Sequence, residues 1–151
     1  MEVKLSVKRL NPDTDRPIAF YQEYQLELDE SATVLDGLIK VREEIDGTLA
    51  LRCSCRSAIC GSCAMRINGR AALACKTKVV EATPASGAPI LVEPMGNAQV
   101  IKDLVVDSQA FWDKVRAVKP WLQPEGPEPE QEYVVPNESM LHLAGVMNCI
   151  M

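Results

Sequence analysis

The sequence predicts an α+β fold in which one helix crosses a small mixed sheet. Three observations support it: two alternating runs near the N-terminus, a 3.6-residue apolar pattern after residue 33, and an Asn-Gly pair between two short strand-like runs. The chain has 151 residues, of which 47% are hydrophobic and 25% charged, so a globular protein is expected. This length allows one medium domain, or a small domain with part of another.

The alternating runs predict an N-terminal hairpin. Val3, Leu5 and Val7 alternate with polar residues, and residues 24–28 repeat the pattern after the turn-rich stretch "NPDTDRP". Each run has one apolar face, as expected for a strand with one side buried. We expect the two strands to pair through a long loop.

A helix of about three turns is expected next. Thr33 and Asp36 fit the capping-box pattern at its start, and Gly47 is expected to close it after Ile45. Its apolar residues fall on one helical face: Val34, Leu35, Leu38, Ile39 and Val41.

A second hairpin and two later strands would complete the sheet. The runs "AMRI" and "RAAL" flank Asn68 and Gly69, a pair suited to a type I′ turn. This hairpin lies between Cys63 and Cys75, so it would bring the last cysteine back beside the others. Further strands are expected at residues 90–92 and 100–106.

The sequence predicts a helix, a linker and a second helix in the C-terminal part of the chain. A helix is expected after Asp107, with its end before Pro120. Residues 120–136 contain five prolines, and the four glutamates at 125, 128, 130 and 132 lie among them without a basic residue, so we interpret this segment as an extended linker or strap. A further helix is expected to start near Ser139.

Charge and targeting features narrow the class of protein. The formal net charge of −5 argues against general nucleic-acid binding and a polybasic membrane anchor. The start, "MEVKLSVKRL", has no apolar signal core, and no apolar run reaches the roughly 18 residues that span a bilayer. We therefore expect a soluble, cytosolic protein, in which clustered cysteines are metal ligands or redox groups rather than disulfides.

Five of the six cysteines lie between residues 53 and 75. Cys55, Cys60, Cys63 and Cys75 have the spacing C-x4-C-x2-C-x11-C, which matches the plant-type ferredoxin arrangement that binds a [2Fe–2S] cluster. The small residues Ser57, Ala58, Gly61 and Ser62 would let backbone N–H groups approach the sulfurs, and Gly61 allows a backbone conformation that other residues avoid.

The cysteine spacing leaves other uses of these thiols open. A four-cysteine zinc site stays open, although zinc ribbons use two C-x2-C knuckles and this chain has one, and four unrelated thiols are a further alternative. A Rieske-type centre needs two histidines, whereas His142 is the only one and is expected to be an ordinary helix residue. Cys53 has the wrong spacing for a ligand and is expected to be a spare thiol.

The cysteines lie in a basic stretch. From residue 47 to residue 80 there is no Asp or Glu, but there are six basic residues: Arg52, Arg56, Arg66, Arg70, Lys76 and Lys78. Because cationic neighbours favour the reduced, more negative form of a bound cluster, we expect a potential above the roughly −400 mV of plant-type ferredoxins. The alternative is a solvated basic face that water screens.

The stretch "CRSAICGSCAMRINGRAALAC" resembles the cluster loop of the iron–sulfur subunits of succinate dehydrogenase and fumarate reductase. "DGTLALRCSCR" is similar to the family's lead into that loop, and "VIKDLVVD" with "KPWL" is similar to its connection toward a second domain. The resemblance covers essentially the whole chain.

This resemblance implies a β-grasp [2Fe–2S] ferredoxin-like domain with Cys55, Cys60, Cys63 and Cys75 as ligands and no catalytic residue. It implies an electron-transfer subunit of a succinate:quinone oxidoreductase. Electrons would pass from the FAD of a flavoprotein subunit to quinone at a membrane anchor. With no targeting signal, the subunit is expected in a prokaryotic cytoplasm, peripheral on the inner face of the cell membrane through its partners.

The family's second domain is helical and holds a [4Fe–4S] and a [3Fe–4S] cluster. The final "NCIM" resembles the start of that domain's cysteine run, so Cys149 would be a [4Fe–4S] ligand in a longer chain. We therefore expect a ferredoxin domain at residues 1–106, a helix and Pro/Glu-rich connection at 107–138, and the beginning of a truncated helical domain at 139–151.

Two other functions use a similar cysteine spacing. The small [2Fe–2S] subunits of molybdenum hydroxylases share it, but they continue into a helical bundle with another cysteine group instead of a Pro/Glu-rich segment. Free ferredoxin carriers also share it, but they are usually shorter and acidic around the cluster, whereas this loop is basic. A zinc-stabilised interaction module remains a further alternative.

Overall fold

The computed structural model describes residues 1–14, 17–121, 123, 126, 130–132 and 134–147. The chain forms two compact units, Met1–Lys114 and Val115–Met151. The first unit contains the sheet and all the cysteines that the structure describes, so it positions the site.

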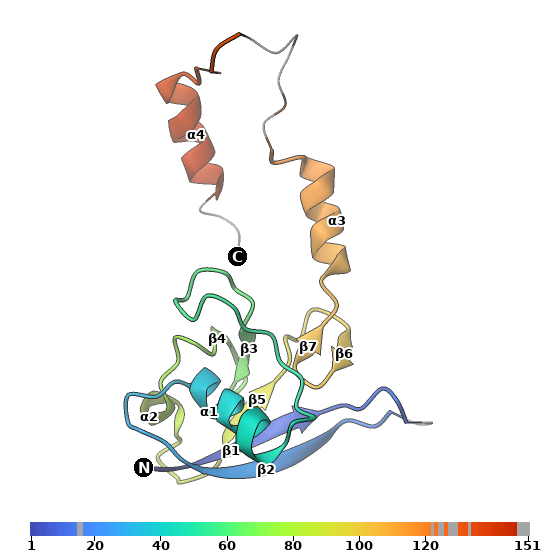
Figure 1. Cartoon of the computed structure of the whole chain (residues 1–151), viewed down its shortest axis with the longest axis vertical. Coiled ribbons are helices and arrows are strands. Elements are labelled where there is room, and N and C mark those ends of the chain that lie inside the picture. Colours follow the sequence, from blue (N-terminus) through green and yellow to red (C-terminus); the bar gives the residue numbers. More distant parts are fainter. Residues whose placement is uncertain (15–16, 122, 124–125, 127–129, 133, 148–151) are drawn as a thin grey trace. The chain divides into compact units, whose positions relative to one another are not determined.

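The first unit contains a five-stranded mixed sheet with the strand order β2-β1-β5-β3-β4 (Figure 1). β1 (Glu2–Arg9) pairs antiparallel with β2 (Phe20–Glu27) along its whole length and parallel with β5 (Ile90–Glu93). β3 (Ala64–Ile67) pairs antiparallel with β5 and with β4 (Arg70–Leu73). The expected mixed sheet, its N-terminal hairpin and the later hairpin are confirmed.

The expected helix begins where the capping box placed it. In α1 (Val34–Lys40), the Thr33 hydroxyl accepts from the Asp36 N–H, and the Asp36 carboxylate accepts from the Thr33 N–H at 2.9 Å. The helix continues as one π-helical turn, η1 (Val41–Ile45), which ends when the Asp46 N–H donates to the Val41 carbonyl at 2.7 Å. The helix ends after Ile45 as predicted, but the wide turn at Asp46 closes it, and Gly47 does not adopt the left-handed conformation of a C-terminal cap.

The hydrophobic core lies between α1 and the sheet. Gly37 allows this close approach: a Cβ atom there would lie 3.3 Å from Cδ1 of Leu5 in β1 and 3.7 Å from Cδ1 of Leu26 in β2. Burial of each leucine or valine side chain contributes about 1.5–3 kcal/mol. The largest fully buried side chains are Leu5, Leu35, Leu38, Leu49, Met65 and Ile90.

The segment expected to be one strand at residues 100–106 is a small separate hairpin. β6 (Val100–Lys102) and β7 (Val105–Val106) pair antiparallel and form a two-stranded sheet. The reason is Asp103, whose φ of 48° turns the chain and whose carboxylate is buried. The prediction of a single strand is wrong for this reason.

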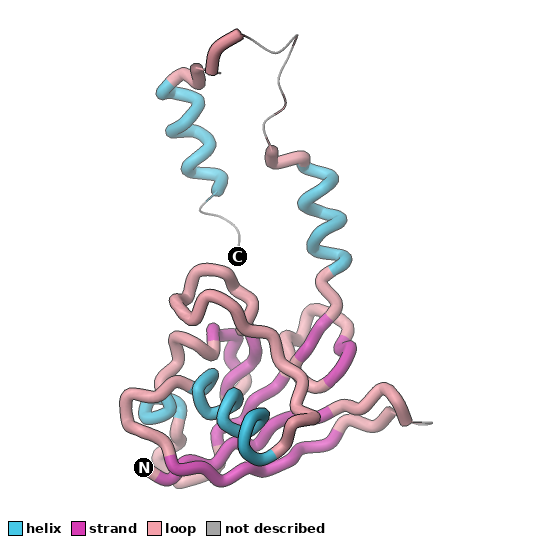
Figure 2. Tube along the Cα trace, viewed as in Figure 1, coloured by secondary structure: helices cyan, strands magenta, loops and turns pink. Residues whose placement is uncertain are grey.

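The remaining helices are short and mostly exposed. α2 (Val79–Ala82) was not predicted, whereas α3 (Gln109–Val118) ends before Pro120 as expected (Figure 2). α4 (Asn137–Met147) begins before Ser139, because the carbonyl of Pro136 already accepts the first helical hydrogen bond, from Met140, at 3.2 Å.

Parts of the expected linker at residues 120–136 lie outside the described residues, so the linker and the three-part domain division stay predictions. No helix in the described part of the chain is long and apolar enough to cross a membrane.

Candidate metal centre

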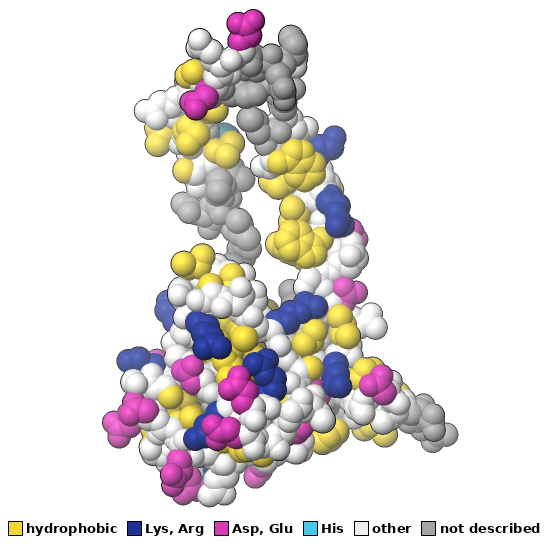
Figure 3. Space-filling view, viewed as in Figure 1, with side chains coloured by type: hydrophobic (Ala, Val, Ile, Leu, Met, Phe, Trp, Pro, Cys, Tyr) yellow, Lys and Arg dark blue, Asp and Glu magenta, His cyan; other side chains and the backbone are white. Residues whose placement is uncertain are grey.

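The cysteine loop, residues 53–63, runs from the segment after η1 to the start of β3 and has no regular secondary structure (Figure 2). Residues 56–62 are exposed, whereas Cys63 at its end is buried with 3% of its surface exposed. In Figure 3, Lys and Arg side chains are prominent on the half of the first unit where Figure 1 draws this loop, and Asp and Glu are more frequent toward the opposite half.

Three residues of the loop have positive φ, in the left-handed region of backbone conformation. Arg56 has φ 54°, Ala58 has φ 58° and Gly61 has φ 72°. Positive φ is strained for residues other than glycine, and it persists where surrounding structure requires it. Alternating conformations of this kind direct successive N–H groups into one concavity, which favours an anionic occupant.

The N–H groups of the loop converge on the sulfur of Cys55. Its Sγ atom accepts from the N–H groups of Ser57 at 3.4 Å, Ile59 at 3.4 Å and Cys60 at 3.3 Å. Three N–H groups therefore point toward one sulfur, which is the arrangement expected around a sulfur that binds metal. Of the four small residues that the sequence predicted for this purpose, Ser57 is one of these donors, whereas the other two donors are Ile59 and Cys60. The role expected of Gly61 is consistent with its positive φ.

Cys60 lies beside Cys55, and its thiol ionises easily. The Ser62 hydroxyl is the main cause, followed by hydrogen bonding with Cys55, and together they lower the pKa of Cys60 to about 6. Cys55 and Cys60 therefore form one thiol pair at the exposed end of the loop.

Cys63 and Cys75 form a second pair, which the β3–β4 hairpin brings together. Ala64 faces Leu73 in the hairpin register, and the Ala74 N–H donates to the Cys63 carbonyl at 3.1 Å, so Cys75 follows directly beside Cys63. Burial raises the pKa of the Cys63 thiol, and Cys75 interacts with it directly. A buried thiol of this kind ionises when a metal ion stabilises the thiolate.

The paired arrangement fits a two-iron cluster. A [2Fe–2S] cluster takes four thiolates, two on each iron. Among the described residues, no three His, Cys, Asp or Glu side chains meet in one single-ion site. The two thiol pairs, the concavity of N–H groups and the basic surroundings together match the donor set of an anionic [2Fe–2S] group.

The remaining sulfur and imidazole candidates are Cys53, His142 and Cys149. Cys53 is half-buried and packs against the hydrophobic core. His142 is an exposed residue of α4, in the second unit. Cys149 lies outside the described residues.

Sequence reasoning missed a buried ion pair between Arg9 and Asp103 at 2.9 Å. One signal was present: Arg9 continues the inward-facing phase of Val3, Leu5 and Val7, where an apolar residue is expected. A charged residue in that phase indicates a buried partner.

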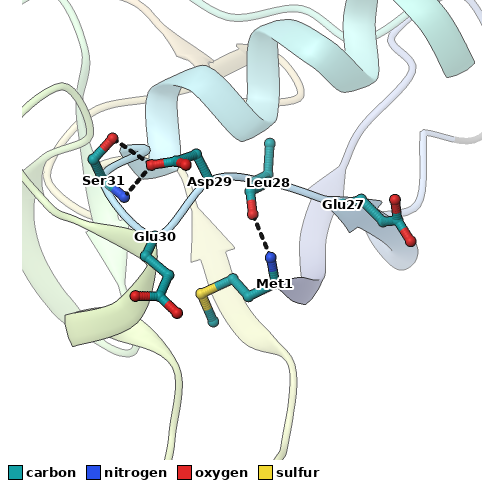
Figure 4. A pocket seen from close by; sticks show the side chains of 6 residues that line it. All are labelled: Met1, Glu27, Leu28, Asp29, Glu30 and Ser31. Atoms are coloured by element: carbon teal, nitrogen blue, oxygen red, sulfur yellow. Dashed lines mark hydrogen bonds between the residues drawn. The ribbon is translucent and has the colours of Figure 1, made fainter.

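A shallow pocket at the start of β1 is unrelated to the cysteines (Figure 4). The Met1 amino group donates to the Leu28 carbonyl at 2.6 Å, and Asp29 accepts from the N–H of Ser31 at 2.8 Å. These contacts fix the end of the β1–β2 pair. The lining residues are Met1, Glu27, Leu28, Asp29, Glu30 and Ser31.

Two thiol pairs on a loop closed by a hairpin of a mixed sheet define a ferredoxin-like [2Fe–2S] protein. Residues 4–113 match the model of the family described as 2Fe-2S iron-sulfur cluster binding domain. The chain belongs to this family, and the predicted [2Fe–2S] cofactor and ferredoxin-like fold are confirmed.

The named relatives below are iron–sulfur subunits of fumarate reductase or succinate dehydrogenase. The chain is 43% identical over 133 residues to the fumarate reductase iron-sulfur subunit of Mycobacterium tuberculosis (strain CDC 1551 / Oshkosh), covering 87% of this chain and 52% of that protein. It is 38% identical over 149 residues to succinate dehydrogenase [ubiquinone] iron-sulfur subunit 1, mitochondrial, of Oryza sativa subsp. japonica, covering 97% and 52%. The expected similarity to these subunits is confirmed.

A solved structure agrees with the sequence relatives. A chain of the Mycobacterium smegmatis Sdh1 complex in the apo form matches with a TM-score of 0.80 and 28% identity, over 99% of this chain and 59% of that one. The chain thus spans about half the length of the curated relatives that it matches.

Proposed function

We propose that the chain is the electron-transfer, [2Fe–2S]-binding part of the iron–sulfur subunit of a succinate:quinone oxidoreductase, either a succinate dehydrogenase or a fumarate reductase. The observation that carries this proposal is the pairing of four thiols in a family whose named relatives are iron–sulfur subunits of those enzymes. When bound, the cluster supplies one-electron transfer.

The ligands in this proposal are Cys55, Cys60, Cys63 and Cys75. Cys55 and Cys60 bind one iron at the exposed end of the loop, and Cys63 and Cys75 bind the other at the end of the β3–β4 hairpin. The contacts between the thiols within each pair support this division.

The chain is a non-catalytic subunit in this proposal. Its partners are a flavoprotein subunit that carries FAD and a membrane anchor that gives access to quinone. It works at the cytoplasmic face of a prokaryotic membrane, which it reaches through those partners. The [4Fe–4S] and [3Fe–4S] clusters of such a subunit would be completed in the length of the relatives that this chain does not span. Cys149 would be a [4Fe–4S] ligand in such a longer chain.

The domain division of the proposal follows from these roles. Residues 1–106 form the [2Fe–2S] ferredoxin domain, residues 107–138 form the connection, and residues 139–151 begin the helical domain. The helix α3 and the proline-containing segment after it support a connecting role.

Metal analysis tests the first half of the proposal. We expect about two irons and two acid-labile sulfides per chain purified without oxygen, with a rhombic EPR signal on reduction. Stoichiometric zinc without sulfide would contradict the assignment.

Electron transfer tests the second half. We expect a flavoprotein subunit of succinate dehydrogenase or fumarate reductase to co-purify with the chain and, with succinate, to bleach its visible spectrum. Cys60→Ala is the matched control, because it lacks one proposed ligand in the exposed pair. A loaded chain that binds no such flavoprotein and is not reduced through it would instead indicate a free carrier.

A further inference from the structure

We infer that Asp103 is a positioning residue for the cluster, because it anchors the segment that delivers Cys55. The lead-in segment is defined here as residues 50–54. The inference rests on the proposed assignment of Cys55 as a ligand and does not depend on which enzyme uses the electrons.

Asp103 is a buried carboxylate, and both of its oxygen atoms accept hydrogen bonds. It lies in the turn between β6 and β7 with 2% of its surface exposed. Its Oδ1 atom accepts from Arg9 Nε at 2.9 Å and from the Leu10 N–H at 3.0 Å, and its Oδ2 atom accepts from the Ala50 N–H at 2.8 Å. Burial of a charged group is tolerated only with such partners, so the carboxylate is fixed in place.

Arg9 connects Asp103 to β2 and to the segment that follows η1. Its Nη1 atom donates to the Asp46 carboxylate at 2.6 Å and to Gln22 Oε1 at 2.9 Å, and its Nη2 atom donates to Thr48 Oγ1 at 2.9 Å. The guanidinium is therefore held by β2 and by the end of η1. Asp103 is hydrogen-bonded to this guanidinium and to the N–H of Leu10, directly after β1.

The lead-in segment is attached to the Asp103 hairpin at successive points. The Ala50 carbonyl accepts from the Leu104 N–H at 3.2 Å, in addition to the bond from the Ala50 N–H to Asp103. Arg52 Nη1 donates to the Val106 carbonyl at 2.9 Å. Beyond this point Cys53 is half-buried, and from Arg56 onward the loop is exposed.

These anchors precede a loop that must present its first ligand accurately. Metal ligands work best when supporting hydrogen bonds hold them within about 0.5 Å of the productive geometry. Residues 56–62 are exposed, so the approach of Cys55 is set by its own N–H contacts and by the lead-in segment. Of the anchors, the Ala50 bond to the Asp103 carboxylate is the only one here with a charged, buried acceptor, which makes it the strongest type.

Asp103→Asn separates the two functions of this side chain. Asparagine has the same shape and tolerates positive φ, but it offers one acceptor oxygen instead of two. That oxygen will face Arg9 and Leu10, where a cation and an N–H both donate. Its NH2 group then faces the Ala50 N–H, so the variant keeps the connection to Arg9 and loses the connection to the lead-in segment.

The experiment compares the loaded chain with Asp103→Asn and with Glu93→Gln. Glu93 is a matched control because it also pairs with a cation, Lys8 at 3.4 Å, and is partly buried, but it accepts from Tyr21 and not from the lead-in segment. We expect Asp103→Asn to release iron to a chelator at least about tenfold faster than wild type, since a bond to a charged acceptor is lost. We also expect shifted EPR g-values and faster hydrogen exchange confined to residues 50–55, all absent from Glu93→Gln.

Arg52→Lys is a second variant, useful if Asp103→Asn does not fold. Arg52 is exposed, and lysine keeps its charge but replaces the planar group that bonds the Val106 carbonyl. We expect faster iron release in the same direction, by a smaller factor.

Unchanged iron release and g-values in Asp103→Asn would overturn the inference. So would hydrogen exchange that increases in the β1–β5 pair of this variant as much as in residues 50–55. If Asp103→Asn does not fold, unchanged iron release in Arg52→Lys would overturn it. The readouts involve no flavoprotein, so failure of electron transfer from succinate leaves this inference standing. Conversely, a normal response to succinate with unchanged iron release would contradict only the role of Asp103.

Discussion

The N–H of Cys60 donates a hydrogen bond to the Sγ atom of Cys55 at 3.3 Å, so one proposed ligand supports the other. The same sulfur accepts from Ser57 and Ile59. Hydrogen bonds to a cluster's sulfurs also raise its reduction potential. The loop therefore combines ligand presentation with electrostatic preparation for an anionic group.

Removal of single cysteines should separate ligands from the spare thiol. We expect Cys60→Ala and Cys63→Ala to lose the visible spectrum and most of the iron, because each leaves one iron with a single thiolate. Cys53→Ala should retain about two irons per chain, since Cys53 packs against the core outside both thiol pairs. Loss of iron in Cys53→Ala, with normal loading of Cys60→Ala, would require a different ligand set.

The basic loop should raise the midpoint potential of the bound cluster. We expect a value clearly above the roughly −400 mV of plant-type ferredoxins. Arg56 is exposed and follows Cys55, so Arg56→Asn should lower the potential, and asparagine tolerates the φ of 54° at this position. Water screens an exposed charge, so the shift should stay within about 40 mV, which is about 1 kcal/mol for one electron.

Redox titration followed by EPR measures this shift. Lys4→Gln, in the first half of β1, is the control, since it removes one positive charge outside the cysteine loop. A shift of equal size in both variants would attribute the effect to net charge alone. A wild-type potential as low as that of a photosynthetic ferredoxin would contradict the role of the basic stretch.

Local patterns in the sequence predicted the elements that depend on neighbouring residues. Alternation identified β1 and β2, the capping box identified the start of α1, and the Asn68-Gly69 pair identified the β3–β4 turn, where φ is 48° and 80°. The thiol spacing belongs to this class too, because three of the four proposed ligands lie within one loop. Each of these features follows from the conformational preferences of a few adjacent residues.

Features that depend on distant partners were missed. Arg9 and Asp103 are 94 residues apart in the sequence, and their contact is what keeps Asp103 buried in a turn and divides the expected strand into β6 and β7. The sequence shows an aspartate among valines, but it does not show the guanidinium that makes its burial tolerable. The role of Asp46 at the end of η1 was missed for a related reason: its carboxylate accepts hydrogen bonds from Arg9 and Tyr24.

Acid should destabilise the fold partly through Asp46. The Thr48 hydroxyl, then Arg9 and Tyr24, donate to this carboxylate and hold its pKa well below its usual range. A lowered pKa in the folded state stabilises the fold above the ordinary value near 3.8 and loses that contribution as the pH falls. We expect Asp46→Asn to lower the free energy of unfolding at pH 7 by about 1–3 kcal/mol. Urea unfolding between about pH 7 and pH 2 should show a shallower acid decline in the variant.

Alkali should destabilise the fold through Tyr24, because here the protonated form is the stabilising one. Burial, and then the hydrogen bond to Asp46, raise the pKa of Tyr24 to about 12 from its ordinary 10.0. The protonated phenol therefore stabilises the fold fully below pH 10, and the contribution is lost as the pH rises from about 10 to 12. Tyr24→Phe should unfold with a weaker dependence on pH in that range. An unchanged alkaline decline in Tyr24→Phe would assign it to other groups.

The left-handed backbone at Gly61 should matter for the cluster beyond its effect on stability. Gly61 has φ 72° and Gly87, in a turn after α2, has φ 73°; neither has an atom within 4 Å of an added Cβ. Alanine should therefore cost each site a similar strain, about 1 kcal/mol, in the metal-free chain. Only Gly61→Ala should also slow reconstitution with iron and sulfide, because its loop must return to this conformation between Cys60 and Cys63. Urea unfolding of both metal-free variants measures the loss of stability, and the rise of visible absorbance measures the rate of reconstitution. Equal reconstitution rates in the two variants would show that the conformation of Gly61 serves the fold alone.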